Sequence, residues 1–246
     1  MQPSPATTAP TPASQEALSR LLGLAIFGER LAARTYNQCS RLEPRHAELL
    51  KRFATMEGRH ARWFLEVSQA NGVVPDKAFA DRELGYLEEQ VDAYAAAGDV
   101  EALLVVKGFI VESLAIATYE PFLAVSDRFV GAREAFQKAL DEEHYHVDWV
   151  IRYLRLHFFD QDERFLELAR RVNVQGVDCI GGTLMNIADH LDAIGLSGAD
   201  SAGAMMDGYT GLLQRVGIDE RLATRDVVSL FMPLIRKYRH GREATA

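Results

Sequence analysis

Two segments of the chain carry a glutamate and a histidine three residues apart, a spacing that makes them neighbours on one helix face. Glu57 and His60 lie in FATMEGRHARWF, and Glu143 and His146 lie in DEEHYHVDW. Apolar residues stand three, four and seven positions from each glutamate, so each glutamate belongs to the buried stripe of a helix. A carboxylate and an imidazole one turn apart can bind the same metal ion, and both segments are therefore candidate metal sites.

Two more glutamates occupy apolar stripes without a histidine. Glu29 has Ile26 and Tyr36 on its helix face, and Glu112 has Phe109 and Tyr119 on its own. A buried carboxylate without a counter-charge costs several kcal/mol, and no Lys or Arg is expected at a matching apolar position. Two divalent metal ions would supply the missing positive charge.

A single Glu-x-x-His is common by chance, and a lone inward glutamate often lies at a boundary or pairs with arginine. The combination of four such helices is harder to explain in this way. It predicts a carboxylate-bridged di-metal centre in a four-helix bundle, to which two helices give one Glu each and two give Glu-x-x-His. Carboxylates with one imidazole per ion favour iron or manganese over zinc, so two Fe ions are expected, with Mn or a mixed Fe/Mn pair as alternatives. The predicted ligands are Glu29, Glu57, His60, Glu112, Glu143 and His146.

Helical periodicity runs through almost the whole chain, and alternating strand patterns are absent, so the fold class is all-α. Polar segments that carry Gly or Pro separate the elements. Pro121 is expected to kink the fourth helix, and Gly181-Gly182 to interrupt the sixth. The Pro- and Thr-rich residues 1–14 predict a disordered tail, followed by a single helical domain over 15–240. Helices are predicted at about 15–41, 44–71, 77–97, 99–127, 132–158, 162–194, 199–216 and 222–238.

Composition excludes several classes of protein. The net charge of −8 and the lack of a basic run argue against nucleic-acid binding. No apolar run reaches the roughly 18–20 residues that a membrane-spanning helix needs. Two cysteines, Cys39 and Cys179, are too few for a disulfide framework, and the expected location is the cytoplasm.

Several segments resemble the aldehyde-deformylating oxygenases, which are ferritin-like enzymes that make alkanes from fatty aldehydes. The similar segments are IFGERLAARTYNQCSRL, LLKRFATMEGRHARWF, IVESLAIATYEPFLAVSDRF and YTGLLQRVGIDERLATRDV, and the likeness extends from about residue 20 to 230. The resemblance implies a ferritin-like bundle with additional C-terminal helices and the same six metal ligands. It implies a di-iron oxygenase that cleaves the C1–C2 bond of an aliphatic aldehyde to an alkane and formate. The reaction would use O2 and an external electron donor, such as ferredoxin and its reductase.

The family also has a hydrophobic tunnel to the metals. Tyr119 is the candidate catalytic residue, as a donor of a hydrogen bond or of a radical electron, although a tyrosine on this face is more often ordinary core. Thr118 stands where family members tend to have alanine, and Glu83-Leu84 where they tend to have two phenylalanines, which favours a shorter or more polar substrate. The positions that match the tunnel are Gly28, Phe64, Ala115, Thr118 and Tyr119.

The sequence leaves two alternative functions open. One is a related ferritin-like N-oxygenase or hydroxylase of a specialised pathway, acting on another small substrate. The other is iron storage, but the helices expected after residue 160 resemble a layer that covers a substrate and weigh against a ferritin-type cage. A monomer is therefore expected.

Overall fold

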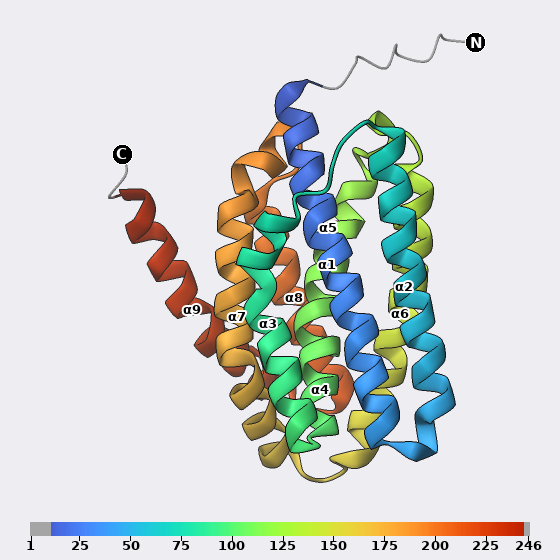
Figure 1. Cartoon of the computed structure of the whole chain (residues 1–246). Coiled ribbons are helices and arrows are strands. Elements are labelled where there is room, and N and C mark those ends of the chain that lie inside the picture. Colours follow the sequence, from blue (N-terminus) through green and yellow to red (C-terminus); the bar gives the residue numbers. More distant parts are fainter. Residues whose placement is uncertain (1–10, 244–246) are drawn as a thin grey trace, which may run out of the picture.

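The structure is a computed structural model that describes residues 11–243, and these residues form helices and turns without a β-strand (Figure 1). Residues 1–10, most of the expected tail 1–14, lie outside the described part, whereas Pro12 already begins a helix. Short 3₁₀ turns occur at Pro44–His46 and Ser126–Arg128. The helices are α1 (Pro12–Leu42), α2 (Ala47–Ala70), α3 (Lys77–Ala97), α4 (Val100–Val105), a π-helical segment (Val106–Val111), α5 (Glu112–Leu123), α6 (Ala132–His157), α7 (Asp162–Ala193), α8 (Gly198–Val216) and α9 (Glu220–Glu243).

Four helices form the bundle that carries the predicted ligands. α1 packs along α2, α2 packs against α6, and α6 packs against α5. α3 and α7 lie against α1 on the other side, and α8 packs on α5 and α7. Figure 1 shows the C-terminal part of α9 standing apart from this body. The additional helices therefore cover the bundle on the side of α1 and α5, as expected from the sequence.

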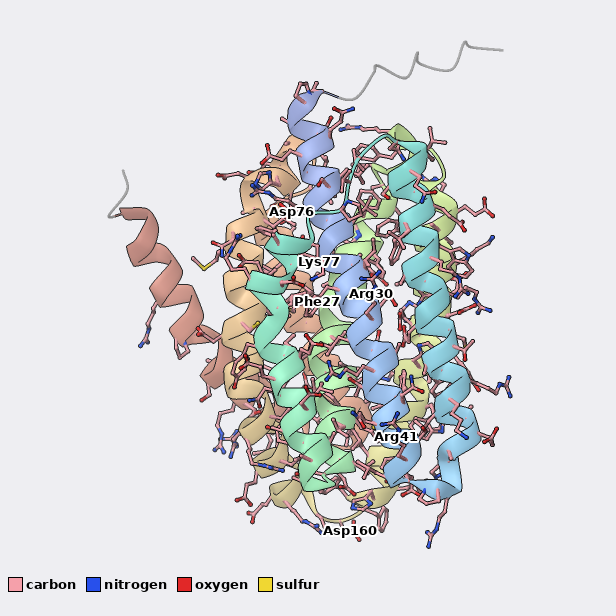
Figure 2. All side chains as sticks on the ribbon, viewed as in Figure 1. Phe27, Arg30, Arg41, Asp76, Lys77 and Asp160 are labelled. Carbon is pink, nitrogen blue, oxygen red and sulfur yellow. The ribbon has the colours of Figure 1, made fainter. Side chains whose placement is uncertain are left out.

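The start of α3 is fixed to α1 by local hydrogen bonds and a close approach. Asp76 caps α3, since its side chain accepts a hydrogen bond from the Phe79 amide at 2.9 Å. The Asp76 amide donates to the Ser19 carbonyl at 3.0 Å, and Figure 2 shows Asp76 and Lys77 beside α1. Gly23 permits this contact, because a Cβ there would lie 2.5 Å from the Asp76 carbonyl oxygen.

The fourth predicted helix, 99–127, differs from expectation. Asp99 caps it as α4, but Val106–Val111 then form a π-helix before α5 begins at Glu112. A π-helix closes i→i+5 hydrogen bonds instead of i→i+4, and such segments are frequent at functional sites. The rod continues through Pro121 to Leu123. The phase of the helix therefore changes just before the Glu112 ligand.

The expected interruption at Gly181-Gly182 was wrong, because α7 is continuous from Asp162 to Ala193. A glycine inside a helix costs only about 1 kcal/mol relative to alanine. Packing of α7 against α1, α3 and the π-helical segment outweighs such a cost. Over the described part of the chain, no helix combines the length and the apolar character needed to cross a membrane.

Candidate metal centre

The structure brings all six predicted ligands together in the bundle core. Glu29 comes from α1, Glu57 and His60 from α2, Glu112 from the start of α5, and Glu143 and His146 from α6. Each side chain is at most 3% exposed. Their donor atoms form two overlapping groups, and within each group all atoms lie within 4.8 Å of one another.

One group, which we call subsite A, surrounds Nδ1 of His60. Oε2 of Glu29 and Oε1 of Glu143 each lie 3.1 Å from that nitrogen. Oε2 of Glu57 lies 3.3 Å from it. Three carboxylate oxygens and one imidazole nitrogen therefore converge on one point.

The second group, subsite B, surrounds Nδ1 of His146. Oε1 of Glu57 lies 3.0 Å from this nitrogen and Oε2 of Glu143 lies 3.1 Å from it. Glu112 completes the group. Glu57 and Glu143 thus face the two subsites with opposite oxygens, which is the arrangement of carboxylates that bridge two metal ions.

These residues fit a pair of divalent metal ions. Within the described part of the chain, both carboxylate oxygens of Glu57 and of Glu112 are buried without a well-aligned hydrogen bond. Glu57 pairs by charge with His146 and Lys107, and Glu112 with Lys107, but none of their four oxygens has the aligned hydrogen bond that buried polar atoms nearly always have. These oxygens are therefore suited to bind metal ions.

Comparison with known proteins agrees with this geometry. The sequence model of the family described as long-chain fatty aldehyde decarbonylase matches residues 12–232. The chain belongs to this family. A solved structure of a Synechococcus protein, described as having aldehyde deformylating oxidase activity, superposes with a TM-score of 0.82 at 28% identity. The match covers 89% of this chain and 98% of that one.

The decarbonylase fold of this chain also holds a lysine in the metal centre. Nζ of Lys107 lies 2.9 Å from Oε1 of Glu57 and 3.4 Å from Oε2 of Glu143, and it contacts Glu112. Its side chain is 1% exposed. The expectation that no buried cation accompanies the four carboxylates was therefore wrong.

The π-helical segment explains why the lysine was missed. Lys107 precedes Glu112 by five residues, which in an α-helix separates the two side chains by about 140° around the axis. With i→i+5 hydrogen bonds, residues five apart point in similar directions. The change in helix type therefore brings Lys107 to the face of Glu112.

The carboxylates of the centre differ in the direction in which their pKa is shifted: it is raised for Glu29 and lowered for Glu57 and Glu143. Burial and the charge of Glu143 raise the pKa of Glu29 well above its usual value. Burial and Glu143 also act to raise the pKa of Glu57, but the charges of Lys107 and His146 outweigh them and bring it to about 2. Burial likewise opposes ionisation of Glu143, yet Lys107 and His146 hold its pKa well below the usual range.

Both imidazoles respond to the surrounding carboxylates. Burial acts to lower the pKa of His60, but hydrogen bonds with Glu143, Glu29 and Glu57 raise it above the ordinary value. Burial opposes the positive charge of His146 as well, and the charge of Glu57 dominates and raises its pKa. In the metal-free protein these imidazoles therefore favour the protonated form, and metal ions would have to replace those protons.

The outer nitrogens of the two imidazoles have different environments. Nε2 of His60 lies 2.9 Å from Glu142, whose carboxylate also accepts two hydrogen bonds from Arg59 at 2.5 and 2.7 Å. Such a partner fixes the orientation of a metal-binding histidine. Nε2 of His146 has no hydrogen-bond partner among the described residues. Periodicity alone could not assign Glu142 to this role, because its partners come from another helix.

An apolar cavity adjoins the ligands. Four of the five predicted tunnel residues line it, namely Gly28, Ala115, Thr118 and Tyr119, and so do the ligands Glu29, Glu112 and Glu143. Phe64, which the structure also describes, does not line it, because its ring packs against Tyr119 and Phe136. The cavity therefore lies between α1, α5, α7 and the middle of α3.

At the two places where the sequence departs from the family pattern, Thr118 and Glu83, the polar groups have hydrogen-bond partners within the protein. The hydroxyl of Thr118 donates to the Leu114 carbonyl at 2.7 Å, so its donor is already used inside the helix. The carboxylate of Glu83 accepts hydrogen bonds from Arg82 at 2.9 Å and Asn186 at 2.7 Å. Leu84 lines the cavity, whereas Glu83 does not. The cavity wall is accordingly apolar at both places.

Proposed function

We propose that the protein is a di-metal oxygenase that cleaves the C1–C2 bond of an unbranched aliphatic aldehyde, giving formate and an alkane one carbon shorter. One observation carries this proposal: the apolar cavity and the metal centre share a wall, formed by Glu29, Glu112 and Glu143. A substrate with an apolar chain and one reactive polar end fits such a site, because the chain can fill the cavity while the carbonyl reaches the carboxylates.

The residues of the chain bind, orient and shield the substrate. Leu21, Leu87 and Ile180 give the cavity apolar walls, and each buried CH2 contributes about 0.8 kcal/mol. Tyr119 lies at the junction of cavity and ligands and holds Glu29 through its hydroxyl. The metal pair would activate O2 and polarise the aldehyde carbonyl when bound.

The proposed reaction requires bound metal ions and an external electron donor. The ligand set supports two iron ions, with manganese or a mixed pair as alternatives. Formation of the alkane from aldehyde and O2 consumes electrons, so an external donor such as ferredoxin with its reductase is required. The protein is proposed to act as a monomer in the cytoplasm, and its two unpaired cysteines are compatible with that location.

Neither alternative function has an observation that favours it. An N-oxygenase or hydroxylase of a specialised pathway would need polar groups for its substrate, whereas the two polar departures, Thr118 and Glu83, have partners within the protein. An iron-storage role leaves the apolar cavity and the covering helices α7 and α8 without a purpose.

The decisive assay loads the protein with Fe(II) without oxygen and then adds O2, a reducing system and unbranched aldehydes of short, medium and long chain. We expect formate and the alkane one carbon shorter in equal amounts. Glu57→Ala is the matched inactive control, because it removes an oxygen from each subsite. A fully loaded protein that consumes no aldehyde, or forms no formate from it, would overturn the proposal.

A further inference from the structure

The contacts of Lys107 are all on one side of the metal centre. Its ammonium approaches Oε1 of Glu57 and Oε2 of Glu143, which are the two oxygens that face His146. The opposite oxygens of these bridging carboxylates face His60 instead. Its third contact, Glu112, also belongs to subsite B and not to subsite A. We infer that Lys107 is a built-in cation of subsite B, which makes the two metal sites unequal so that subsite A fills first.

Competition for the same oxygens is the physical basis of this inequality. A divalent ion in subsite B needs the oxygens that the ammonium now occupies, whereas an ion in subsite A can bind Glu29 and the far oxygens of Glu57 and Glu143. A second ion must therefore displace the ammonium or accept a like charge a few ångströms away. Both cost affinity, because charges interact strongly in a buried environment.

The lysine cannot easily leave the site. Its backbone belongs to the π-helical segment, which packs so closely on α6 that a Cβ at Gly108 would lie 2.8 Å from Val150. Its ammonium lies 4.9 Å from the ring centre of Tyr36, which is itself fully buried. A cation over an aromatic ring is stabilised by the ring electrons. The side chain is thus held at subsite B from two directions.

The net charge of the centre also predicts that subsite A fills before subsite B. Four carboxylates balance two divalent ions, and the ammonium of Lys107 is one positive charge in excess of that balance. With one ion bound in subsite A, the ammonium instead supplies part of the charge that the carboxylates at subsite B require. The inference concerns the binding of metal and is independent of which substrate the protein converts.

The test is a Mn(II) titration of the whole protein, followed by equilibrium dialysis and electron paramagnetic resonance. For the wild type we expect two binding steps, with the second dissociation constant about tenfold or more above the first. The first equivalent should give the signal of an isolated Mn(II) ion, and the signal of a coupled pair should appear only with the second. Two equal steps in the wild type would overturn the inference.

Lys107→Gln removes the charge and keeps a side chain of similar length. The variant should lower the dissociation constant of the second Mn(II) toward that of the first. The signal of a coupled pair should then appear from the first additions of Mn(II). Lys138→Gln is the matched control, because Lys138 is half exposed and pairs with Glu134, which is not one of the predicted ligands. A Lys107→Gln protein that is folded by circular dichroism but keeps the wild-type gap between the steps would refute the role of Lys107.

A third variant tests the assignment of the subsites independently of Lys107. Glu112→Gln removes a carboxylate from subsite B and leaves every residue of subsite A in place. We expect the first Mn(II) to bind with wild-type affinity and the second step to vanish from the titration. Loss of the first step instead would show that subsite B fills first and would contradict the inference.

Discussion

The hydroxyl of Tyr119 donates a hydrogen bond to Oε1 of Glu29 over 2.7 Å, while the same residue lines the apolar cavity. Oε2 of Glu29 faces His60 in subsite A. One carboxylate therefore connects the cavity wall to a metal ligand, and a substrate that touches Tyr119 can influence the position of Glu29.

The first prediction concerns this connection. Tyr119→Phe removes the donor and leaves a buried carboxylate oxygen unsatisfied, which should lower the free energy of unfolding of the metal-free protein by about 1–3 kcal/mol. Urea unfolding measures this. If Tyr119 also acts in the reaction, formate production by the iron-loaded variant should fall while its iron content stays at the wild-type level. Wild-type turnover would make Tyr119 a packing residue only.

The second prediction concerns the cavity. Ala115→Phe should block long aldehydes and spare short ones, whereas Thr118→Ala should extend acceptance toward longer chains. Each methylene that gains or loses a buried position should change kcat/KM by about fourfold. Iron content, measured in parallel, should be unchanged in both variants. The placement of the tunnel would be wrong if both variants kept the chain-length profile of the wild type.

A third prediction follows from the bridging geometry. Glu57 faces both subsites, so Glu57→Ala should reduce bound metal to a small fraction of the wild-type amount. Glu29 faces subsite A alone within the two groups, so Glu29→Ala should weaken mainly the binding of one ion. Elemental analysis after loading and desalting distinguishes the two cases. Equal losses in both variants would contradict the assignment of Glu57 as a bridge.

The fourth prediction concerns the effect of pH on the metal-free protein. The raised pKa of His60 gives stability that is complete below its unfolded value, near 6.5, and is lost as the pH rises. The pKa of Glu57, lowered to about 2, gives stability that is complete above its unfolded value, near 4.5, and is lost as the pH falls. The raised pKa of Glu29 also removes stability as the pH rises above its unfolded value. Urea unfolding should therefore show an optimum between about pH 4.5 and 6.5, nearer the lower limit. A steady increase toward alkaline pH would exclude this balance.

The burial and convergence of the six candidate ligands could be predicted because regular α-helical spacing relates each glutamate to the apolar residues around it. Glu57 and Glu143 lie inside uninterrupted helices, so the period that predicted their burial is the one the chain adopts. The resemblance to the family, and not periodicity, predicted Gly28 and Ala115 as tunnel residues, and both line the cavity. Local periodicity thus accounts for most of the fold and for the burial of the candidate ligands.

Features that depend on a change of helix type or on a partner from another helix were not predictable in this way. Lys107 reaches the carboxylates because the helix is π-helical at that point, and an α-helical period directs it elsewhere. Phe64 lies on the same helix face as Glu57, but its ring packs against Tyr119 and Phe136 and does not line the cavity. The partnership of His60 with Glu142 likewise depends on how α2 and α6 lie together.

The chain has two tryptophans, and they stand in different relations to the two imidazoles. Trp63 stacks directly on His60, with ring centres 5.4 Å apart and an angle of 26° between the planes. Trp149 contacts Phe53, and Phe53 in turn packs on His146. An indole in contact with a metal-binding imidazole senses its protonation and the magnetic character of a bound ion through quenching of its emission. Protonation or metal binding at His60 should therefore change the emission of Trp63 directly, whereas the ring of Phe53 separates Trp149 from His146.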